Sequence, residues 1–158
     1  MAKRIAVFAG SFDPITIGHE SIVRRALPLF DEIIVAVGRN STKNYMFSLE
    51  QRVDWIKKTF ADAPLVKVDL FEGLTVNYCK EKGANFLLRG LRSAADFEFE
   101  KAIAHMNHAM NPALETVFIL TLLEHSAISS TIIRDIVRNN GDASPFVPKP
   151  VDLKNSKS

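Results

Sequence analysis

The stretch from Ile5 to His19 reads IAVFAGSFDPITIGH and predicts a strand, a turn and the start of a helix. Ile5 to Ala9 is an apolar run, Gly10 opens the turn, and an amphipathic segment begins close to His19. A strand that ends in a glycine-bearing turn and re-enters a helix directs free backbone N–H groups and the helix's positive end at one place. We therefore expect this stretch to bind a phosphate group, as in a nucleotide site.

His19 falls at the beginning of that predicted helix, where its imidazole can donate to a phosphate oxygen as charge grows on it. Gly10 permits a turn that a side chain would obstruct, and Gly18 lets a ligand approach the backbone closely. In the simpler interpretation, Ser11 and Asp13 only build the turn and His19 only caps the helix. The T-x-G-H spacing at residues 16–19 favours the binding site.

Further along the chain, β-rich runs alternate with segments of helical spacing. The predicted strands cover residues 4–9, 33–38, 66–71, 86–89 and 116–122, and the later predicted helices cover 49–60, 74–82, 94–110 and 130–140. Ser48 and Gln51 have the spacing of a capping box for the second helix. Five β-then-α units predict an α/β protein with a single doubly wound domain and a five-stranded parallel sheet. We expect this domain at residues 1–148, followed by a polar, proline-punctuated and disordered tail at 149–158.

Composition is that of an ordinary globular domain. The 158 residues are 47% hydrophobic and 24% charged, and the net charge of +2 is too small to favour a nucleic-acid partner. No apolar run is long enough for a membrane span or a signal peptide, so no membrane partner is expected. Cys79 is the single cysteine and excludes an intrachain disulfide. These features predict a cytoplasmic protein.

The distinctive polar blocks all follow predicted strands. Because ligands bind at the carboxyl ends of parallel strands, residues 10–19, Lys43, residues 89–92 and residues 129–131 are expected on one rim. Arg89 and Arg92, expected in a loop, carry guanidinium forks suited to phosphate, although they could also be a solvated surface pair. The hydroxyls of residues 129–131 exceed what ordinary helix capping requires.

The sequence GSFDPITIGH at 10–19 resembles the T/H-x-G-H signature of the nucleotidyltransferase superfamily, and in particular its bacterial phosphopantetheine adenylyltransferase family. KNYMFSLEQR at 43–52, RGLR at 89–92, DFEFE at 96–100 and ISST at 128–131 follow in the family's order. The resemblance extends from residue 4 to about residue 148. It implies a Rossmann-like fold and transfer of the adenylyl group of ATP to 4′-phosphopantetheine, giving dephospho-coenzyme A and pyrophosphate.

The resemblance also implies roles for individual residues. The catalytic residues would be His19, Lys43 and Ser11, with His19 against the α-phosphate. The acceptor would be bound by Ser11, Lys43, Leu74, Thr75, Arg89 and Asn107. ATP would be bound by Ser11, Phe12, His19, Gly90, Leu91, Arg92, Glu100, His125, Ser126, Ala127, Ile128, Ser129, Ser130 and Thr131. Taken alone, Lys43 would be a surface lysine, and Leu74, Thr75 and Asn107 could equally belong to the core.

Some positions depart from the family pattern. Ser11 stands where threonine is common, and His125 and Ala127 replace an aromatic-Ser-aromatic pattern, so the packing around adenine need not follow the family. Mg²⁺ is expected to be held mainly by ATP phosphates, because no clustered carboxylates form a metal cage and His105, His108 and Cys79 lack metal-ligand spacing. The resemblance implies a homohexamer.

Two other functions remain open on the sequence. Another nucleotidyltransferase, acting on nicotinamide mononucleotide or transferring a cytidylyl group, could share T-x-G-H, but RGLR followed by DFEFE argues against it. A nucleotide-sensing module without turnover could keep the same fold. The presence of His19, Lys43, Arg89 and Arg92 together argues against that alternative.

Overall fold

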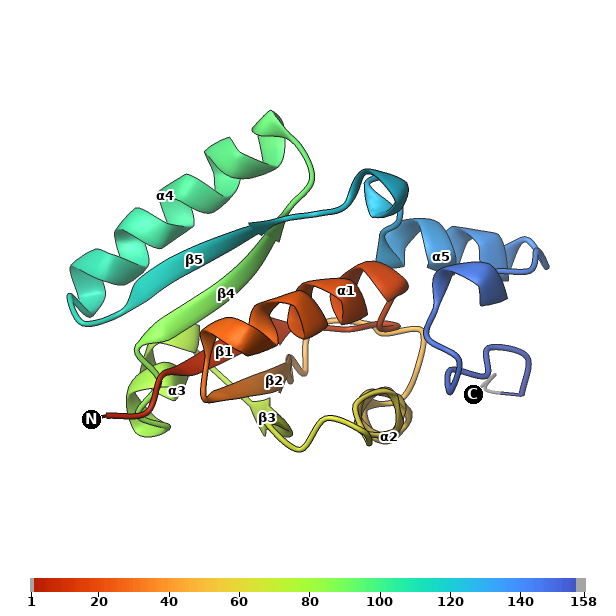
Figure 1. The fold of residues 1–158 in the computed structure, drawn as a ribbon. Helices are drawn as coiled ribbons and strands as arrows, with labels where there is room; N and C mark the ends of the chain where they lie inside the picture. The colour runs from red at the N-terminus through yellow and green to blue at the C-terminus, as the bar shows by residue number, and fades with distance from the viewer. Residues whose placement is uncertain (1, 156–158) are drawn as a thin grey trace.

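The computed structural model describes residues 2–155, which alternate β-strands and α-helices (Figure 1). The strands are β1 (Ile5–Gly10), β2 (Glu32–Gly38), β3 (Val66–Phe71), β4 (Phe86–Leu91) and β5 (Glu115–Leu120). The helices are α1 (Ile17–Ala26), α2 (Leu49–Thr59), α3 (Thr75–Glu81), α4 (Ala94–Met110) and α5 (Ser130–Arg138). All ten predicted elements are confirmed, with ends that differ by up to two residues.

The five strands form one parallel sheet in the order β3-β2-β1-β4-β5. β1 lies in the centre and pairs with β2 from Ile5↔Glu32 to Gly10↔Val37. The chain winds outward from β1 in both directions, so the strand order reverses between β1 and β4. In sheets of this kind the crevice outside the carboxyl ends at that reversal binds ligands.

Helices cover both faces of the sheet, which explains why the central strands are apolar on both sides. Phe8 of β1 belongs to a core cluster with Ile22 of α1 and Ile56 of α2. Its neighbour Val7 belongs to a second cluster with Cys79 of α3. Successive residues of one strand thus contribute to opposite layers, as the period of a β-strand requires.

Side-chain caps fix where the helices begin. The Ser48 side chain accepts a hydrogen bond from the Gln51 N–H (3.1 Å), which is one of the two bonds of the predicted capping box. The full reciprocal box is found at α1 instead, between Thr16 and His19. Each cap satisfies a backbone donor that the first turn of a helix leaves free.

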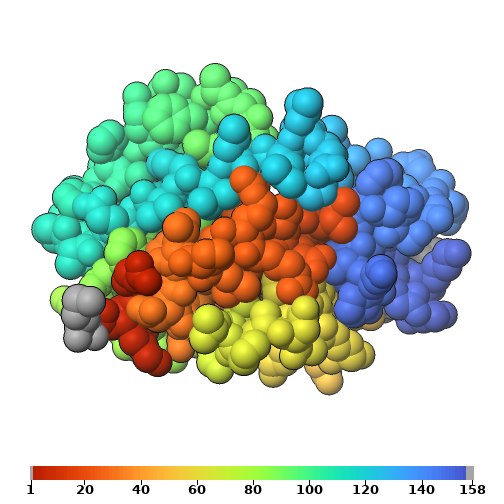
Figure 2. All heavy atoms as spheres, in the orientation of Figure 1, coloured from red at the N-terminus to blue at the C-terminus, as the bar shows by residue number. Residues whose placement is uncertain are grey.

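The C-terminal segment packs against the domain at Val151 and Leu153, whereas we expected a disordered tail at 149–158. Val151 and Leu153 are 6% and 8% exposed and join the larger core cluster with Val147. Figure 2 shows this blue segment against the orange and yellow parts of the chain. The polar composition of the segment suggested disorder, although the apolar side chains of Val151 and Leu153, two residues apart, both pack into the core. The rest of the predicted tail, residues 156–158, lies outside the described residues.

Within residues 2–155, no helix combines the length and the apolar character needed to cross a bilayer.

Candidate active site

Two adjoining cavities open at the carboxyl ends of the strands. The first, about 380 Å³, lies between the turn after β1, the end of β4 and the start of α5. The second, about 690 Å³, lies between the ends of β1, β2 and β3 and helix α4. They share Ala9, Gly10, Ser11, Arg89 and Glu100. The predicted convergence of separate blocks on one rim is confirmed, and the two cavities meet at a junction formed by these five residues.

The turn after β1 is held rigidly by a buried carboxylate. Asp13 is 4% exposed and accepts hydrogen bonds from the backbone N–H groups of Met46 and Phe47, both at 2.9 Å. Arg52 of α2 donates to the carbonyl of Ser11 (2.7 Å), and Arg134 of α5 donates to the carbonyl of Asp13 (2.8 Å). Three distant segments therefore fix one turn.

The left-handed conformation in this turn falls on Phe12 (φ 48°), and Gly10 has no positive φ. A Cβ on Gly10 would meet the Phe12 ring at 3.3 Å. A side chain at position 10 would thus crowd the Phe12 ring, in agreement with our expectation that it would obstruct this turn.

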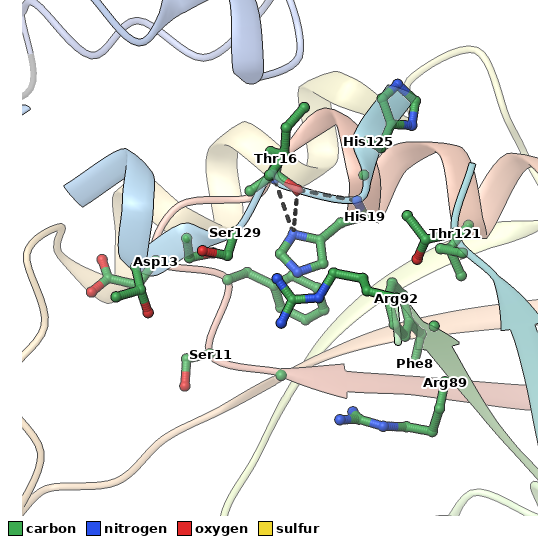
Figure 3. Close-up of a pocket in the computed structure, with 18 of the residues that line it drawn as sticks. Phe8, Ser11, Asp13, Thr16, His19, Arg89, Arg92, Thr121, His125 and Ser129 are labelled. Atoms are coloured by element: carbon green, nitrogen blue, oxygen red, sulfur yellow. Dashed lines mark hydrogen bonds between the residues drawn. The ribbon is translucent and has the colours of Figure 1, made fainter. Parts of the chain in front are cut away.

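His19 is oriented by the start of its own helix. Its Nδ1 lies 3.0 Å from the backbone nitrogen of Thr16 and 3.2 Å from the Thr16 hydroxyl (Figure 3). A backbone N–H only donates, so Nδ1 accepts and the proton of the neutral ring resides on Nε2. The simpler interpretation, that His19 caps the helix, is confirmed. The ring N–H, on Nε2, lies at the first cavity without a hydrogen-bond partner among residues 2–155, and its contact with a phosphate stays a prediction.

The protein keeps His19 neutral. Burial lowers the pKa of the ring from 6.5 to about 4, and the positive charges of Arg89 and Arg92 add to the effect. At neutral pH the ring is a hydrogen-bond donor without a charge. Anionic phosphates beside the two arginines would oppose part of this effect.

Lys43 reaches the turn after β1 from the loop after β2. Its ammonium lies 3.1 Å from the Ser11 hydroxyl and within 5.4 Å of the Tyr45 ring centroid. Two of the three predicted catalytic residues are therefore in direct contact, and both line the first cavity with His19.

Arg89 and Arg92 each face a carboxylate of α4. Arg89 belongs to β4 rather than to the expected loop, because the strand continues to Leu91. Its Nε and Nη2 lie 3.0 and 2.7 Å from the two carboxylate oxygens of Glu100, and its Nη1 donates to the carbonyl of Ala9 (2.9 Å). Arg92 contacts Asp96 at 3.3 Å.

The hydroxyls at the start of α5 tie this helix to the rim. Ser129 caps the helix by accepting from the Ile132 N–H (3.2 Å). Ser130 donates to the carbonyl of Pro14 (2.8 Å), and Thr131 accepts from Arg134 (3.2 Å). The start of α5 therefore faces the first cavity with its backbone N–H groups and with hydroxyls whose positions are fixed.

Most of the predicted site residues line one of the two cavities. The first cavity includes Ser11, Phe12, His19, Lys43, Arg89, Gly90, Arg92, Glu100, His125, Ile128, Ser129, Ser130 and Thr131. The second includes Ser11, Thr75, Arg89, Glu100 and Asn107. Four predicted residues, Leu74, Leu91, Ser126 and Ala127, are not among the lining residues of either cavity in the described part of the chain. Contact of these four with substrate stays a prediction.

The sequence analysis missed one residue that lines the site and one that supports it from outside. Arg134 lines the first cavity, and its position three residues after Thr131 on the same helix was the available signal. Arg52 lay within a quoted block but had no assigned role. Its burial (2% exposed) and its bond to the Ser11 carbonyl depend on tertiary packing that no local pattern reveals.

Acidic and histidine side chains are not gathered into a metal site within residues 2–155, where no group of three or more His, Cys, Asp or Glu side chains could hold an ion. The carboxylates of the first cavity are engaged elsewhere: Glu100 with Arg89, Asp96 with Arg92, and Asp13 with backbone N–H groups.

Comparison with known proteins agrees with this geometry. A family profile described as cytidylyltransferase-like matches residues 7–136. The chain is 57% identical over 151 residues to a phosphopantetheine adenylyltransferase of Flavobacterium psychrophilum, covering 96% of this chain and 99% of the relative. It is 54% identical to the protein of the same name from Flavobacterium johnsoniae, with the same coverage.

Solved structures of low sequence identity share the fold. A putative nicotinate-nucleotide adenylyltransferase from Vibrio parahaemolyticus superposes with a TM-score of 0.65 at 21% identity, covering 94% of this chain and 96% of that one. A bifunctional NMN adenylyltransferase/ADP ribose pyrophosphatase from Francisella tularensis gives 0.66 at 17% identity, covering 92% of this chain and 44% of that one. The full-length relatives and the family profile show that the chain belongs to the phosphopantetheine adenylyltransferase family of the nucleotidyltransferase superfamily.

Proposed function

We propose that this protein transfers the adenylyl group of ATP to 4′-phosphopantetheine, forming dephospho-coenzyme A and pyrophosphate. One observation supports this proposal above all: two cavities on one rim meet at Ser11, Arg89 and Glu100, with the His19 N–H available beside them. ATP would occupy the first cavity and the acceptor the second. The reacting phosphates would then meet at the junction.

The reaction follows from these positions as a direct displacement. An oxygen of the acceptor phosphate forms a bond to the α-phosphorus of ATP, the bond from that phosphorus to the bridging oxygen breaks, and pyrophosphate leaves with its electron pair. The acceptor phosphate is largely ionised at neutral pH because its second pKa is about 6. The mechanism therefore needs no general base and no covalent enzyme intermediate.

Catalysis then consists of positioning and charge stabilisation. His19 donates its Nε2 proton to an oxygen of the α-phosphate, and this bond strengthens as charge grows in the transition state. Lys43, held beside the Ser11 hydroxyl, supplies a mobile positive charge near both reactants. Arg89 holds the acceptor phosphate, and Arg92 with the start of α5 holds the phosphates of ATP.

We propose Mg²⁺ as the cofactor, bound chiefly through the phosphates of ATP. When bound there, it neutralises charge on the leaving pyrophosphate. The engaged carboxylates of the first cavity support a route in which the nucleotide brings the ion.

We also propose a homohexameric assembly in the cytoplasm. Apolar side chains form a stripe along α4 at helical spacing: Phe99, Ile103, Met106 and Met110 are 68%, 40%, 62% and 51% exposed. Contact with another copy would cover this stripe. Light scattering coupled to size exclusion should give six chains for the wild type and fewer for Met106→Glu, whereas a monomeric wild type would contradict the assembly.

The single buried cysteine, Cys79, supports a reducing location.

The activity is tested by measuring pyrophosphate release with ATP and one of three additions. We expect rapid release with phosphopantetheine, and only background release with nicotinamide mononucleotide or with no acceptor. Release with nicotinamide mononucleotide would identify a different adenylyltransferase. Binding of ATP without release under any condition would indicate a nucleotide sensor.

A further inference from the structure

The two arginines of the rim differ in how their carboxylate partners are placed. Arg89 and Glu100 both line the two cavities, whereas Arg92 and Asp96 line only the first. Glu100 and Asp96 are four residues apart on α4, so one face of this helix presents a carboxylate to each arginine. The Arg89–Glu100 pair is thus located where the proposed function, on which this inference rests, places the acceptor phosphate.

Arg89 is held by three hydrogen bonds, and two of its N–H donors are not used by them. A guanidinium has five N–H bonds. Two point to Glu100 and one points to the Ala9 carbonyl. Among residues 2–155, the other two N–H bonds, one on Nη1 and one on Nη2, have no hydrogen-bond partner. A phosphate could bind these two donors without displacing Glu100.

Glu100 is poorly placed to release Arg89. Its side chain is 11% exposed, and both oxygens bond to this one guanidinium. Moving Arg89 onto a phosphate would leave a nearly buried carboxylate without a partner, which is costly. The pair is therefore expected to persist when the acceptor binds.

We propose that Glu100 is a positioning residue for the acceptor: it fixes Arg89 so that the two remaining N–H bonds align the acceptor phosphate with the α-phosphorus. The resemblance to the family implied a contact with ATP for Glu100, and this role is different. Glu100 acts through Arg89 and governs the attack angle of the nucleophile. A misaligned nucleophile lowers the rate even when it is bound.

This role separates kcat from acceptor binding. Glu100→Gln keeps the size of the side chain but removes the charge, so the junction becomes more positive and the acceptor phosphate should bind at least as well. The amide also opposes one N–H of Arg89, so the guanidinium loses its fixed orientation. We expect kcat to fall about tenfold to a hundredfold, with the acceptor KM and the dissociation constant of ATP within threefold of the wild type.

Glu100→Asp provides the complementary variant, because it keeps the charge and shortens the side chain by one methylene. If orientation is what Glu100 supplies, Glu100→Asp also lowers kcat by at least tenfold. A rate equal to that of the wild type in Glu100→Asp would show that only the charge matters and would overturn the proposal. Thermal unfolding of each variant, within a few degrees of the wild type, verifies that the fold is intact.

A double-mutant cycle tests whether Glu100 acts through Arg89. Arg89→Lys keeps the positive charge and removes the fork. In that background Glu100→Gln should lower kcat by less than threefold, because the group that it orients is gone. Asp96→Asn is the matched control, since its partner is Arg92, and its effect should be the same in both backgrounds.

The outcomes are distinct. An equal loss from Glu100→Gln in both backgrounds, a weaker affinity for ATP, or a kcat at or above the wild-type value would overturn the positioning role. Failure of the wild type to use phosphopantetheine would instead overturn the proposed function.

Discussion

The backbone N–H of Thr16 lies 3.0 Å from Nδ1 of His19, and this contact determines what the histidine can do. Because Nδ1 accepts, the neutral ring carries its proton on Nε2, and a pKa of about 4 keeps the ring neutral at physiological pH. The helix cap thus leaves on Nε2 the N–H donor that the proposed mechanism uses. The structural role and the proposed catalytic role of His19 involve different nitrogens of the same ring.

Substitution of His19 should separate these two roles. Glutamine at the third position of a helix completes a capping box, so His19→Gln should retain the cap and lose the imidazole N–H. We expect kcat to fall by about two to three powers of ten while the affinity for ATP stays within threefold. His19→Ala should show the same loss of kcat and an additional loss of about 1 kcal/mol in the free energy of unfolding. Steady-state kinetics measure kcat, and urea unfolding measures the change in stability. A kcat near the wild-type value in His19→Gln would remove His19 from the mechanism.

The depressed pKa of His19 predicts a specific dependence of stability on pH. Between pH 6.5 and about 4 the unfolded chain binds a proton at His19 that the folded chain does not, so stability is lost as the pH falls through this window. The difference between the two pKa values, from 6.5 to about 4, corresponds to about 3 kcal/mol.

His19→Gln is again the matched control, because all carboxylates are unchanged and their contributions cancel in the comparison. Urea unfolding at pH 7 and pH 4.5 should show a smaller acid destabilisation in the variant than in the wild type. Equal pH dependence in the two proteins would show that the ring titrates normally in the folded state. In the wild type, ATP should raise the pKa of His19 in an NMR titration, since phosphate charge opposes that of Arg89 and Arg92.

The fold could be read from the sequence because its signals are local. The alternation of apolar runs and helical spacing predicted the five strands and five helices. The cap at Ser48 and the hydroxyls at 129–131 marked helix starts that the structure confirms. The predicted rim also followed, because parallel strands place their carboxyl ends together. Local chemistry and topology were sufficient for these features.

What the sequence left unpredicted depends on tertiary contacts. The backbone hydrogen bonds from Met46 and Phe47 to Asp13 join segments more than 30 residues apart, as does the bond from Arg52 to the Ser11 carbonyl. The Arg89–Glu100 pair could not be predicted, because no local pattern shows that one face of α4 lies against the end of β4. We expected disorder in the tail because its overall composition is polar. Composition does not show that Val151 and Leu153 each pack into the core.

Loss of the Asp13 carboxylate should destabilise the protein and loosen the site. Asp13→Ala removes the acceptor of two backbone N–H groups in a buried place, and unsatisfied donors of this kind cost about 1 to 3 kcal/mol each. We expect a loss of about 3 kcal/mol in the free energy of unfolding. Asp54→Ala is the control: this residue forms an exposed pair with Lys58 and should cost less than about 0.5 kcal/mol. Similar urea midpoints for the two variants would contradict the anchoring role of Asp13.

The packed C-terminal segment leads to a prediction about stability that is independent of the chemistry. Val151 and Leu153 are nearly fully buried in the larger core cluster, whereas Lys154 between the core and the chain end is exposed. Truncation of a buried leucine to alanine costs about 2 kcal/mol or more, and that of a valine somewhat less. The double variant Val151→Ala/Leu153→Ala should therefore lose about 3 kcal/mol in urea unfolding, while Lys154→Ala stays within about 0.5 kcal/mol of the wild type. Because neither apolar residue lines the two cavities, kcat at 25 °C should be unchanged in the folded double variant. A double variant as stable as Lys154→Ala would mean that the segment contributes nothing to the core in solution.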